Sequence, residues 1–371
     1  MAVSRTMLKR TVSATAVACA VALVAALPLS AQAGSGGLTP VVEGLDGPRG
    51  VAVGPGGRVV VAETDGSFSS VATKGRHAGG VTPMGSVPAG FIAPAVDLNG
   101  LGQTFVLTTA GAPDSGAATL YRWAPGWKSV KPVADIAAYQ VTDPDEADLE
   151  DFPEDSNPFG LAALGDGSVL VADAAGNDLL RVYPNGTIVT VARLLPRVVE
   201  VPEELPDEFD GEPLPPAGTP IPSEAVATSV TVGSDGYWYV GELRGFPATP
   251  GTSQVWRIKP GSVDAVCDPE SPDTGNCRRY ADGFTSITDL AADSRGGIYV
   301  VELVQQSWLQ WELGLVDPPL GGLFRIPRGG GTPVELAAGQ LMLPGAADVD
   351  HSGKVFITGP VFGPGALSKI G

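Results

Sequence analysis

The chain has 371 residues, with 23 Lys and Arg against 41 Asp and Glu and a formal net charge of −18 at pH 7. A protein with this net charge repels nucleic acid and anionic lipid, so the composition excludes a basic nucleic-acid-binding surface.

Residues 1–33 are typical of a secretory signal peptide: three cations precede an apolar run from Val12 to Leu27, and Ala-Gln-Ala ends at Ala33. The apolar run is shorter than a membrane span requires, so no membrane span is expected. Cleavage near Ala33 removes three cations and no carboxylates, which leaves 20 Lys and Arg against 41 Asp and Glu, a net charge of −21. We therefore expect a secreted or extracytoplasmic protein.

A 17-residue unit then recurs six times, and each copy is predicted to be a β-hairpin with a glycine turn at its tenth position. A third strand follows every unit, and a fourth follows five of them. The units start at Pro48, Ala93, Pro158, Ala227, Ile287 and Pro344, and their turn glycines are Gly57, Gly102, Gly167, Gly236, Gly296 and Gly353.

The last copy has three strands, while the segment from Leu38 is a strand without a partner ahead of the first unit. A closed ring in which the N-terminal strand completes the last blade removes both exposed edges. The sequence therefore predicts an all-β, six-bladed β-propeller over residues 34–371, which we expect to be a monomer.

This topology sorts the loops by face. The turns between first and second strands, and those between third and fourth strands, share one nearly bare face. The opposite face carries long insertions that start at Thr142, Pro196, Arg244 and Gln305. Because long loops on a rigid scaffold usually bind ligands, we expect the ligand or partner on this loop-rich face.

Cys267 and Cys277 bracket one short loop rich in Pro, Gly and Asp, and in an exported protein they are predicted to form a disulfide. A redox role is the alternative, although the spacing is not Cys-x-x-Cys. The histidines are His77 and His351, and both lie in short turns far from the insertions. Nothing in the sequence therefore indicates a Ser-His-Asp arrangement.

The segment PFGLAALGDGSVLVADAAGNDLLRVYPNG from Pro158 is similar to an NHL repeat, the unit of six-bladed propellers. SNPFGL, VADAAGNDLLRV and TSVTVGSDGYWYVGELRGFPATPGTSQVWRIKPG resemble the ScyD/ScyE family of exported bacterial proteins over essentially the whole chain after the signal peptide. The resemblance implies an extracytoplasmic propeller of a family named for its association with scytonemin biosynthesis, although its members occur in many bacteria that do not make this pigment. It carries no catalytic residues with it.

Metal-dependent lactonases of this fold hold one divalent cation with acidic and amide side chains at the starts of the innermost strands. In the third column of the repeat, Asp289 is the one good ligand, with Ser229 in the same column and Arg49 in the column before it. A hard cation needs several oxygens, so that site is expected to be missing or weak.

The sixteenth column of the repeat carries four carboxylates at the loop-rich ends of second strands. They could recruit a cation or bind a ligand, or each could cap loop amides within its own blade, which is the reading we favour. These residues are Glu63, Asp173, Glu242 and Glu302.

Two insertions add further candidates. Trp308 and Trp311 could form one side of an aromatic-ligand site beside the channel mouth, or could pack as a lid on their own blade. The acidic segment 142–158, with Asn157, could hold calcium, although eight acids in one segment more often mean a solvated loop.

The sequence alone leaves two functions, of which we favour the first. The first is a non-enzymatic binding or scaffold propeller with a small molecule or protein as partner and no required cofactor. The second is an enzyme of secondary metabolism, or a hydrolase with weak dependence on a divalent cation such as calcium, that uses Asp289 with Arg49 and the sixteenth-column carboxylates.

Overall fold

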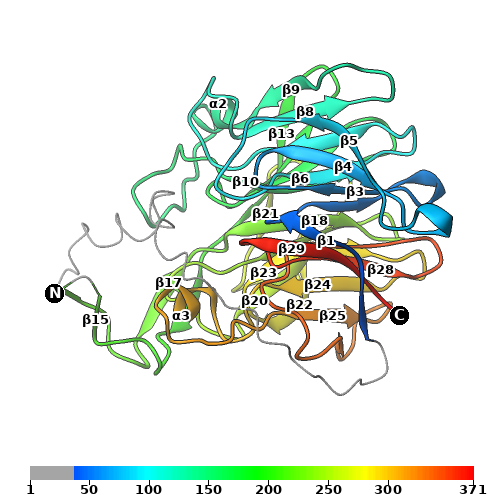
Figure 1. Ribbon diagram of the computed structural model, residues 1–371. Helices are drawn as coiled ribbons and strands as arrows, with labels where there is room; N and C mark the ends of the chain where they lie inside the picture. Colours follow the sequence, from blue (N-terminus) through cyan, green and yellow to red (C-terminus); the bar gives the residue numbers. More distant parts are fainter. Residues whose placement is uncertain (1–36, 210) are drawn as a thin grey trace.

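The computed structural model describes residues 37–209 and 211–371, so the expected signal peptide lies outside the described residues. Six antiparallel sheets surround a common axis as the blades of a β-propeller, which confirms the expected fold (Figure 1). The first three blades are β2 (Val51–Val53), β3 (Val59–Ala62), β4 (Ser67–Val71) and β5 (Val81–Ser86); β6 (Ala95–Leu98), β7 (Thr104–Leu107), β8 (Thr119–Trp123) and β9 (Lys131–Asp135); and β10 (Pro158–Ala163), β11 (Val169–Asp173), β12 (Asp178–Val182) and β13 (Ile188–Leu194).

The other three blades repeat this order from the axis outward. They are β18 (Ala227–Val232), β19 (Trp238–Glu242), β20 (Ser253–Ile258) and β22 (Cys277–Phe284); β23 (Ile287–Ala292), β24 (Ile298–Glu302), β25 (Gly322–Ile326) and β26 (Val334–Leu336); and β27 (Ala347–Val349), β28 (Val355–Gly359), β29 (Pro364–Ile370) and β1 (Leu38–Asp46). In the sixth blade, β1 pairs antiparallel with β29 from Leu38↔Ile370 to Asp46↔Pro364. The first and last blades thus become neighbours, and their innermost strands β2 and β27 are in contact.

Glycine is required both in the turns and where blades meet. Gly167 and Gly236 lie in hairpin turns with φ of 86° and 80°, a left-handed conformation that side chains other than glycine rarely adopt. At Gly160, a Cβ atom would lie 2.6 Å from the carbonyl oxygen of Thr228 in the next blade. The repeat thus sets both the reversal of the chain and the close approach of adjacent sheets.

The core consists of apolar layers between neighbouring blades. One layer joins the third and fourth blades and includes Leu170, Leu179, Val240 and the fully buried Trp256. Side chains alternate across each strand, so each sheet buries both faces against its two neighbours. No helix among the described residues is long and apolar enough to cross a membrane.

The insertions gather on the left of the view in Figure 1, opposite the short turns. They contain the helices α2 (Ile136–Gln140) and α3 (Trp308–Glu312) and two small hairpins. These hairpins are β14 (Arg197–Glu200) with β17 (Pro220–Ser223), and β15 (Glu208–Phe209) with β16 (Glu212–Pro213). The 3-10 turns η1 (Pro55–Gly57) and η2 (Gly75–His77) belong to the short-turn face.

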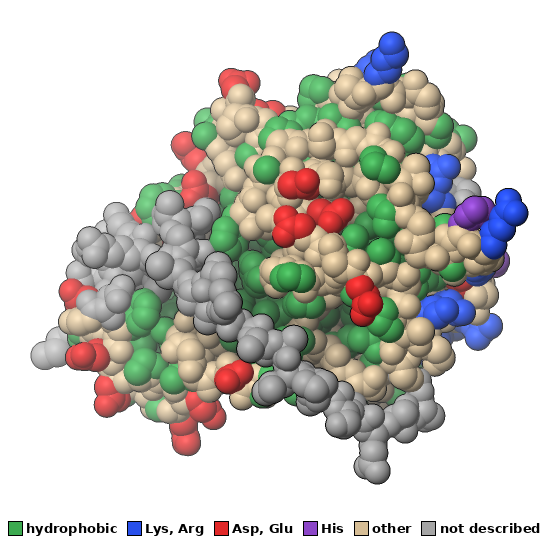
Figure 2. Space-filling model, viewed as in Figure 1, with side chains coloured by type: hydrophobic (Ala, Val, Ile, Leu, Met, Phe, Trp, Pro, Cys, Tyr) green, Lys and Arg blue, Asp and Glu red, His purple; other side chains and the backbone are tan. Residues whose placement is uncertain are grey.

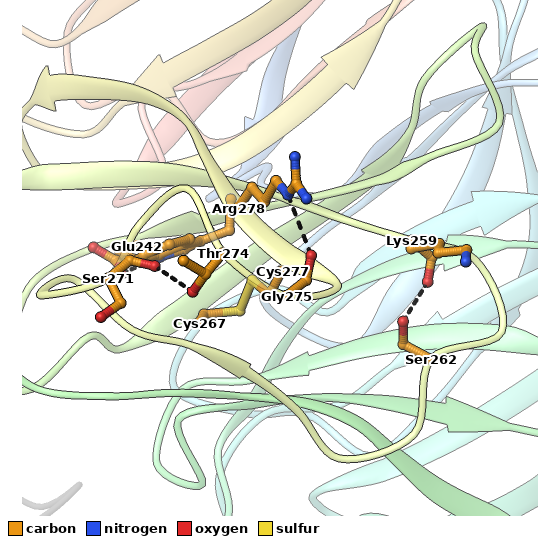
Figure 3. The surroundings of a disulfide bond; sticks show 10 residues. Glu242, Lys259, Ser262, Cys267, Ser271, Thr274, Gly275, Cys277 and Arg278 are labelled. Carbon is orange, nitrogen blue, oxygen red and sulfur yellow. Dashed lines mark hydrogen bonds between the residues drawn. A yellow bond between two sulfur atoms is a disulfide. The ribbon is translucent and has the colours of Figure 1, made fainter.

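Cys267 and Cys277 form the predicted disulfide, with an S–S distance of 1.98 Å and Cα atoms 5.0 Å apart (Figure 3). The loop that it closes is also held internally, because Thr274 Oγ1 donates to the carbonyl of Ser271 at 2.9 Å. The sequence did not reveal that this loop begins with a strand, β21 (Ala265–Cys267), which adds parallel to the outer edge of the third blade. The disulfide therefore links the edge of one blade to the outer strand of the next.

Candidate functional site

A cavity of about 190 Å³ lies on the propeller axis and is lined by the innermost strands of all six blades. Most of its wall is backbone and small apolar side chains, as expected from the alternation in these strands. Three carboxylates also line the cavity, whose surface is mostly polar: Asp97 from β6, Asp289 from β23 and Asp348 from β27. We call these three residues the channel carboxylates.

Backbone amides of the following blade hold each channel carboxylate in place. Asp97 Oδ2 accepts from the N–H of Ala163 at 2.7 Å, and Asp289 Oδ2 accepts from Ala347 at 2.9 Å. Asp348 Oδ2 accepts from Val53 at 2.6 Å. Each side chain therefore crosses a blade junction with a fixed orientation, although it keeps partial contact with water inside the channel.

Burial raises the pKa of all three carboxyl groups. It raises the pKa of Asp97 to about 6 and, with repulsion from Asp97, the pKa of Asp348 to about 7. For Asp289, burial and repulsion from Asp348 outweigh the attraction of Arg49 and raise the pKa to about 8. Because the groups interact, their protons leave in coupled steps near neutral pH.

Arg49 closes the loop-rich end of the channel. Its guanidinium donates to the carbonyl of Ala93 at 3.0 Å and to the carbonyl of Phe159, and it lies 3.6 Å over the centre of the Phe159 ring. Arg49 is 4% exposed, and its neighbours at the starts of the innermost strands are also buried, including Thr228 (2%) and Thr288 (7%). Burial lowers the pKa of Arg49 to about 10, which still leaves it cationic at neutral pH.

The other end of the channel is open to solvent. The residues at the short-turn ends of the innermost strands are all partly exposed: Val53, Leu98, Ala163, Val232, Ala292 and Val349. A small molecule would therefore reach the channel carboxylates from the short-turn face. The sequence favoured the loop-rich face, because it could not show that Arg49 spans the mouth there.

The sixteenth-column carboxylates accept hydrogen bonds from nearby amides and hydroxyl groups, and Glu63 does so across a blade junction, because Asp46 ends β1 of the sixth blade. Glu63 accepts from the N–H of Asp46 at 2.8 Å, and Glu302 accepts from Thr285 at 2.7 Å. Asp173 accepts from the N–H of Asn157 at 2.7 Å and from Ser156 Oγ at 2.7 Å. The bonds of Asp173 and Glu302 match the capping alternative, the bond of Glu63 joins the first and sixth blades, and none of them tests a ligand.

Glu242 makes the most enclosed of these contacts. Both Glu242 (0% exposed) and Arg244 (1%) are buried and form an ion pair with each other. Glu242 also accepts from Trp256 Nε1 at 2.5 Å and from the N–H of Gln254 at 3.1 Å. Burial raises the pKa of Glu242, and Arg244 opposes that shift. The ion-pair and hydrogen-bond partners of this carboxylate all belong to its own blade.

The tryptophan insertion forms α3 and packs across blades rather than on its own blade. Trp308 Nε1 donates to the carbonyl of Arg244 in the fourth blade at 2.9 Å. The Trp311 ring stacks on Phe362 of the sixth blade, with centroids 5.7 Å apart and planes 27° apart.

Ser229, another candidate, is fully buried and its Oγ has no hydrogen-bond partner among the described residues.

The acidic segment 142–158 folds onto the third blade and is not simply solvated. Asp145 is 6% exposed and accepts from Asn177 Nδ2 at 2.9 Å, while Asp143 pairs with Arg193 at 2.5 Å. Asn157 Oδ1 accepts from the N–H of Ala110 at 3.1 Å, so its amide joins the second and third blades.

Residues 37–209 and 211–371 contain no group of three or more His, Cys, Asp or Glu side chains that could hold a metal ion. Each channel carboxylate directs one oxygen at a backbone amide of a different blade junction. A lactonase-like centre at Asp289 and a calcium site in the acidic segment therefore do not fit the described side chains.

Two of the channel carboxylates were missed by the sequence reasoning. Asp97 and Asp348 occupy the fifth column of the repeat, whereas Asp289 occupies the third. A signal was present, because the remaining fifth-column residues are small or neutral: Ala52, Ala162, Thr231 and Ala291. A carboxylate in a short strand with apolar neighbours on both sides indicates a special environment.

No family model matches the chain, and no curated protein matches it. Its fold is shared by solved structures at low identity. A PQQ-bound aldose sugar dehydrogenase from Streptomyces coelicolor is 14% identical with a TM-score of 0.53, covering 92% of this chain and 99% of its own. A gluconolactonase from Xanthomonas campestris is 11% identical with a TM-score of 0.51, covering 90% and 89%. A streptogramin B lyase is 12% identical with a TM-score of 0.50, covering 90% and 97%.

These neighbours correct the first functional expectation. All three are named as enzymes, and the enzyme hypothesis therefore replaces the non-enzymatic binding or scaffold propeller as the reading taken forward. The physical reason for the earlier preference was the poor metal-ligand set at Asp289. That argument weighs against metal chemistry only, and it leaves acid–base chemistry by carboxylates open.

Proposed function

We propose that this protein is an enzyme that performs acid–base chemistry on a small molecule in its central channel. One observation carries the proposal: Asp97, Asp289 and Asp348 face one solvent-connected cavity of about 190 Å³. Paired carboxyl groups with pKa values that straddle neutral pH are what general acid–base catalysis requires. The shared fold with a gluconolactonase and a lyase supports this assignment.

The reaction class that suits these groups is hydrolysis of an ester or lactone, and each carboxyl group has a defined role in it. Asp97, with a pKa of about 6, is ionised at neutral pH and takes a proton from the attacking water. Asp289, with a pKa of about 8, is protonated and gives its proton to the leaving alkoxide as the acyl–oxygen bond breaks. Asp348 raises the pKa of Asp289 by repulsion, and its own pKa is raised by burial and by repulsion from Asp97.

A structural role is the competing explanation, because each carboxylate also links two blades through a backbone amide. Asparagine separates the two roles. Its amide oxygen can still accept the N–H of the next blade, while its amide group cannot transfer a proton at neutral pH. A stable Asp289→Asn protein without activity would therefore indicate chemistry.

The cellular setting belongs to the same proposal. The Cys267–Cys277 disulfide, the predicted signal peptide and the resemblance to NHL-repeat and ScyD/ScyE propellers all fit a monomeric enzyme that acts outside the cytoplasm. Small extracytoplasmic products of secondary metabolism are accordingly the first compounds to examine.

The test is a pH-stat assay of the protein after residue 33 against five- and six-membered lactones and simple aryl esters, with and without EDTA. We expect hydrolysis that resists EDTA and is lost in Asp97→Asn and Asp289→Asn, but is retained in Asp166→Asn, which alters a carboxylate in an exposed turn. Hydrolysis that persists in the Asp97→Asn, Asp289→Asn double variant would contradict the proposed roles.

A further inference from the structure

Charge is distributed unequally between the two faces of the propeller. Figure 2 shows the visible Lys and Arg side chains along the right-hand edge and at the top right, toward the short turns, and most visible Asp and Glu on the left and centre. The acids are concentrated in the insertions; segment 142–158 alone contains eight. The net charge therefore does not describe the short-turn face.

The cations are most concentrated where the sixth, first and second blades meet this face. Their turns and adjacent strand ends carry eight Lys and Arg, while the same turns contain one carboxylate, Asp350, 3.8 Å from Lys74. We call these eight residues the cationic sector: Arg58, Lys74, Arg76, Arg122, Lys128, Lys131, Lys354 and Lys369.

Apolar and aromatic side chains stand among these cations. Leu101, in the turn between β6 and β7, is 83% exposed, the highest exposed fraction among the large hydrophobic residues that the structure describes as exposed. The Trp127 ring is partly exposed, with Lys131 Nζ 4.4 Å and the Arg122 guanidinium carbon 5.5 Å from its centre. Exposed leucine, tryptophan and lysine together are typical of surfaces that enter the headgroup region of a bilayer.

Because salt screens distant charges, the local charge of a face decides whether an anionic surface is attracted to it. At physiological salt, the Debye length is about 8 Å. The acidic insertions lie on the opposite face, one strand length of roughly 10–20 Å away, so screening weakens their repulsion of an anionic surface that touches the short turns. The expectation that net acidity excludes anionic lipid is therefore corrected: whether the protein attracts such lipid depends on which of its two faces meets the membrane.

We propose that the cationic sector docks this protein peripherally on an anionic phospholipid bilayer, with Leu101 entering the headgroup layer. A bilayer fits better than a soluble polyanion because the turns of three neighbouring blades carry the cations together with an exposed leucine, for which a soluble polymer offers no apolar contact. This inference does not depend on the enzymatic proposal.

The test is flotation of the protein after residue 33 with vesicles of phosphatidylcholine alone, or of phosphatidylcholine with an equal amount of phosphatidylglycerol, at physiological salt. The triple variant Lys74→Gln, Arg76→Gln, Lys128→Gln neutralises exposed cations of the sector. A control with the same net charge, Arg278→Gln, Arg295→Gln, Arg328→Gln, neutralises exposed cations of the fourth and fifth blades on the same face.

We expect binding to the anionic vesicles only, weakened about 100-fold by the sector variant and less than about threefold by the control. Leu101→Ser should weaken it about threefold or more. No binding to anionic vesicles would overturn the proposal, as would equal losses in the two triple variants. Full competition by soluble polyphosphate together with an unaffected Leu101→Ser protein would also overturn it, because a soluble polyanion would then be the partner. Thermal melts of each variant confirm that it is folded.

Discussion

Replacing Asp289 with asparagine should stabilise the protein at alkaline pH and leave it unchanged at acid pH. The ordinary pKa of this group is 3.8, whereas burial raises it to about 8 in the folded protein. Between these values the folded state retains a proton that the unfolded chain releases. Folding stability from this group is therefore fully present below the unfolded pKa and is lost as the pH rises toward 8.

The magnitude follows from the size of the shift. A rise from 3.8 to about 8 is equivalent to roughly 6 kcal/mol at about 1.4 kcal/mol per pH unit. The side chain keeps some contact with water, so about half of this, ~3 kcal/mol, is a realistic expectation. A folded domain of about 335 residues unfolds with an entropy near 0.7 kcal/mol/K, which converts this to about 4 °C in Tm.

The assay is a series of thermal melts from pH 4 to pH 9 on the wild type and Asp289→Asn. Asp350→Asn is a control of opposite sign, because hydrogen bonds from Ser352 and Lys354 outweigh burial and lower the pKa of Asp350. That control should lose stability at neutral pH. A constant difference between Asp289→Asn and wild type across the pH range would refute the reasoning, since it would show that the buried charge is not the source.

Other changes have equally specific outcomes. Replacing both Cys267 and Cys277 with serine should cost about 3 kcal/mol, because the disulfide closes a short loop with a sequence separation of 10; an unchanged urea midpoint would contradict this. Arg49→Met removes the cation that lowers the pKa of Asp289, so the pH dependence of any channel activity should move to higher pH, and a profile that stays in place would argue against this electrostatic contact. Gly160→Ala should lower stability by about 2 kcal/mol or more, because the new Cβ meets the backbone of the next blade at 2.6 Å, and a Tm equal to wild type would show that the blades can separate at little cost.

Most of the fold could be predicted because each blade repeats the same local sequence pattern. A turn glycine such as Gly236 and the alternating pattern beside it specify a hairpin without reference to the rest of the chain. The parallel strand Ala265–Cys267 could not be predicted in this way. It depends on the exposed outer edge of the third blade, which exists only after the neighbouring blades have formed.

The site was less predictable for a related reason. Asp289 was identified from its column of the repeat. Its partners Asp97 and Asp348 lie in another column, and they line the same cavity because the ring places their strands around one axis. Arg49 was a candidate ligand residue, and its role as the closure of the loop-rich end follows from contacts with Ala93 and Phe159 in two other blades. The fifth column of the repeat marks Asp97 and Asp348 as unusual, but which blade junction each of them spans is visible only in the folded ring.

The separation of charge between the faces gives the molecule an electric dipole roughly along the propeller axis, with its positive end at the short turns. A dissolved anion is therefore attracted locally to the cationic sector of the first, second and sixth blades, and is repelled by the acidic insertions of the opposite face. The same asymmetry would let one protein bind both cation and anion exchangers, in opposite orientations. For this chain, the isoelectric point describes the sum of two unlike surfaces.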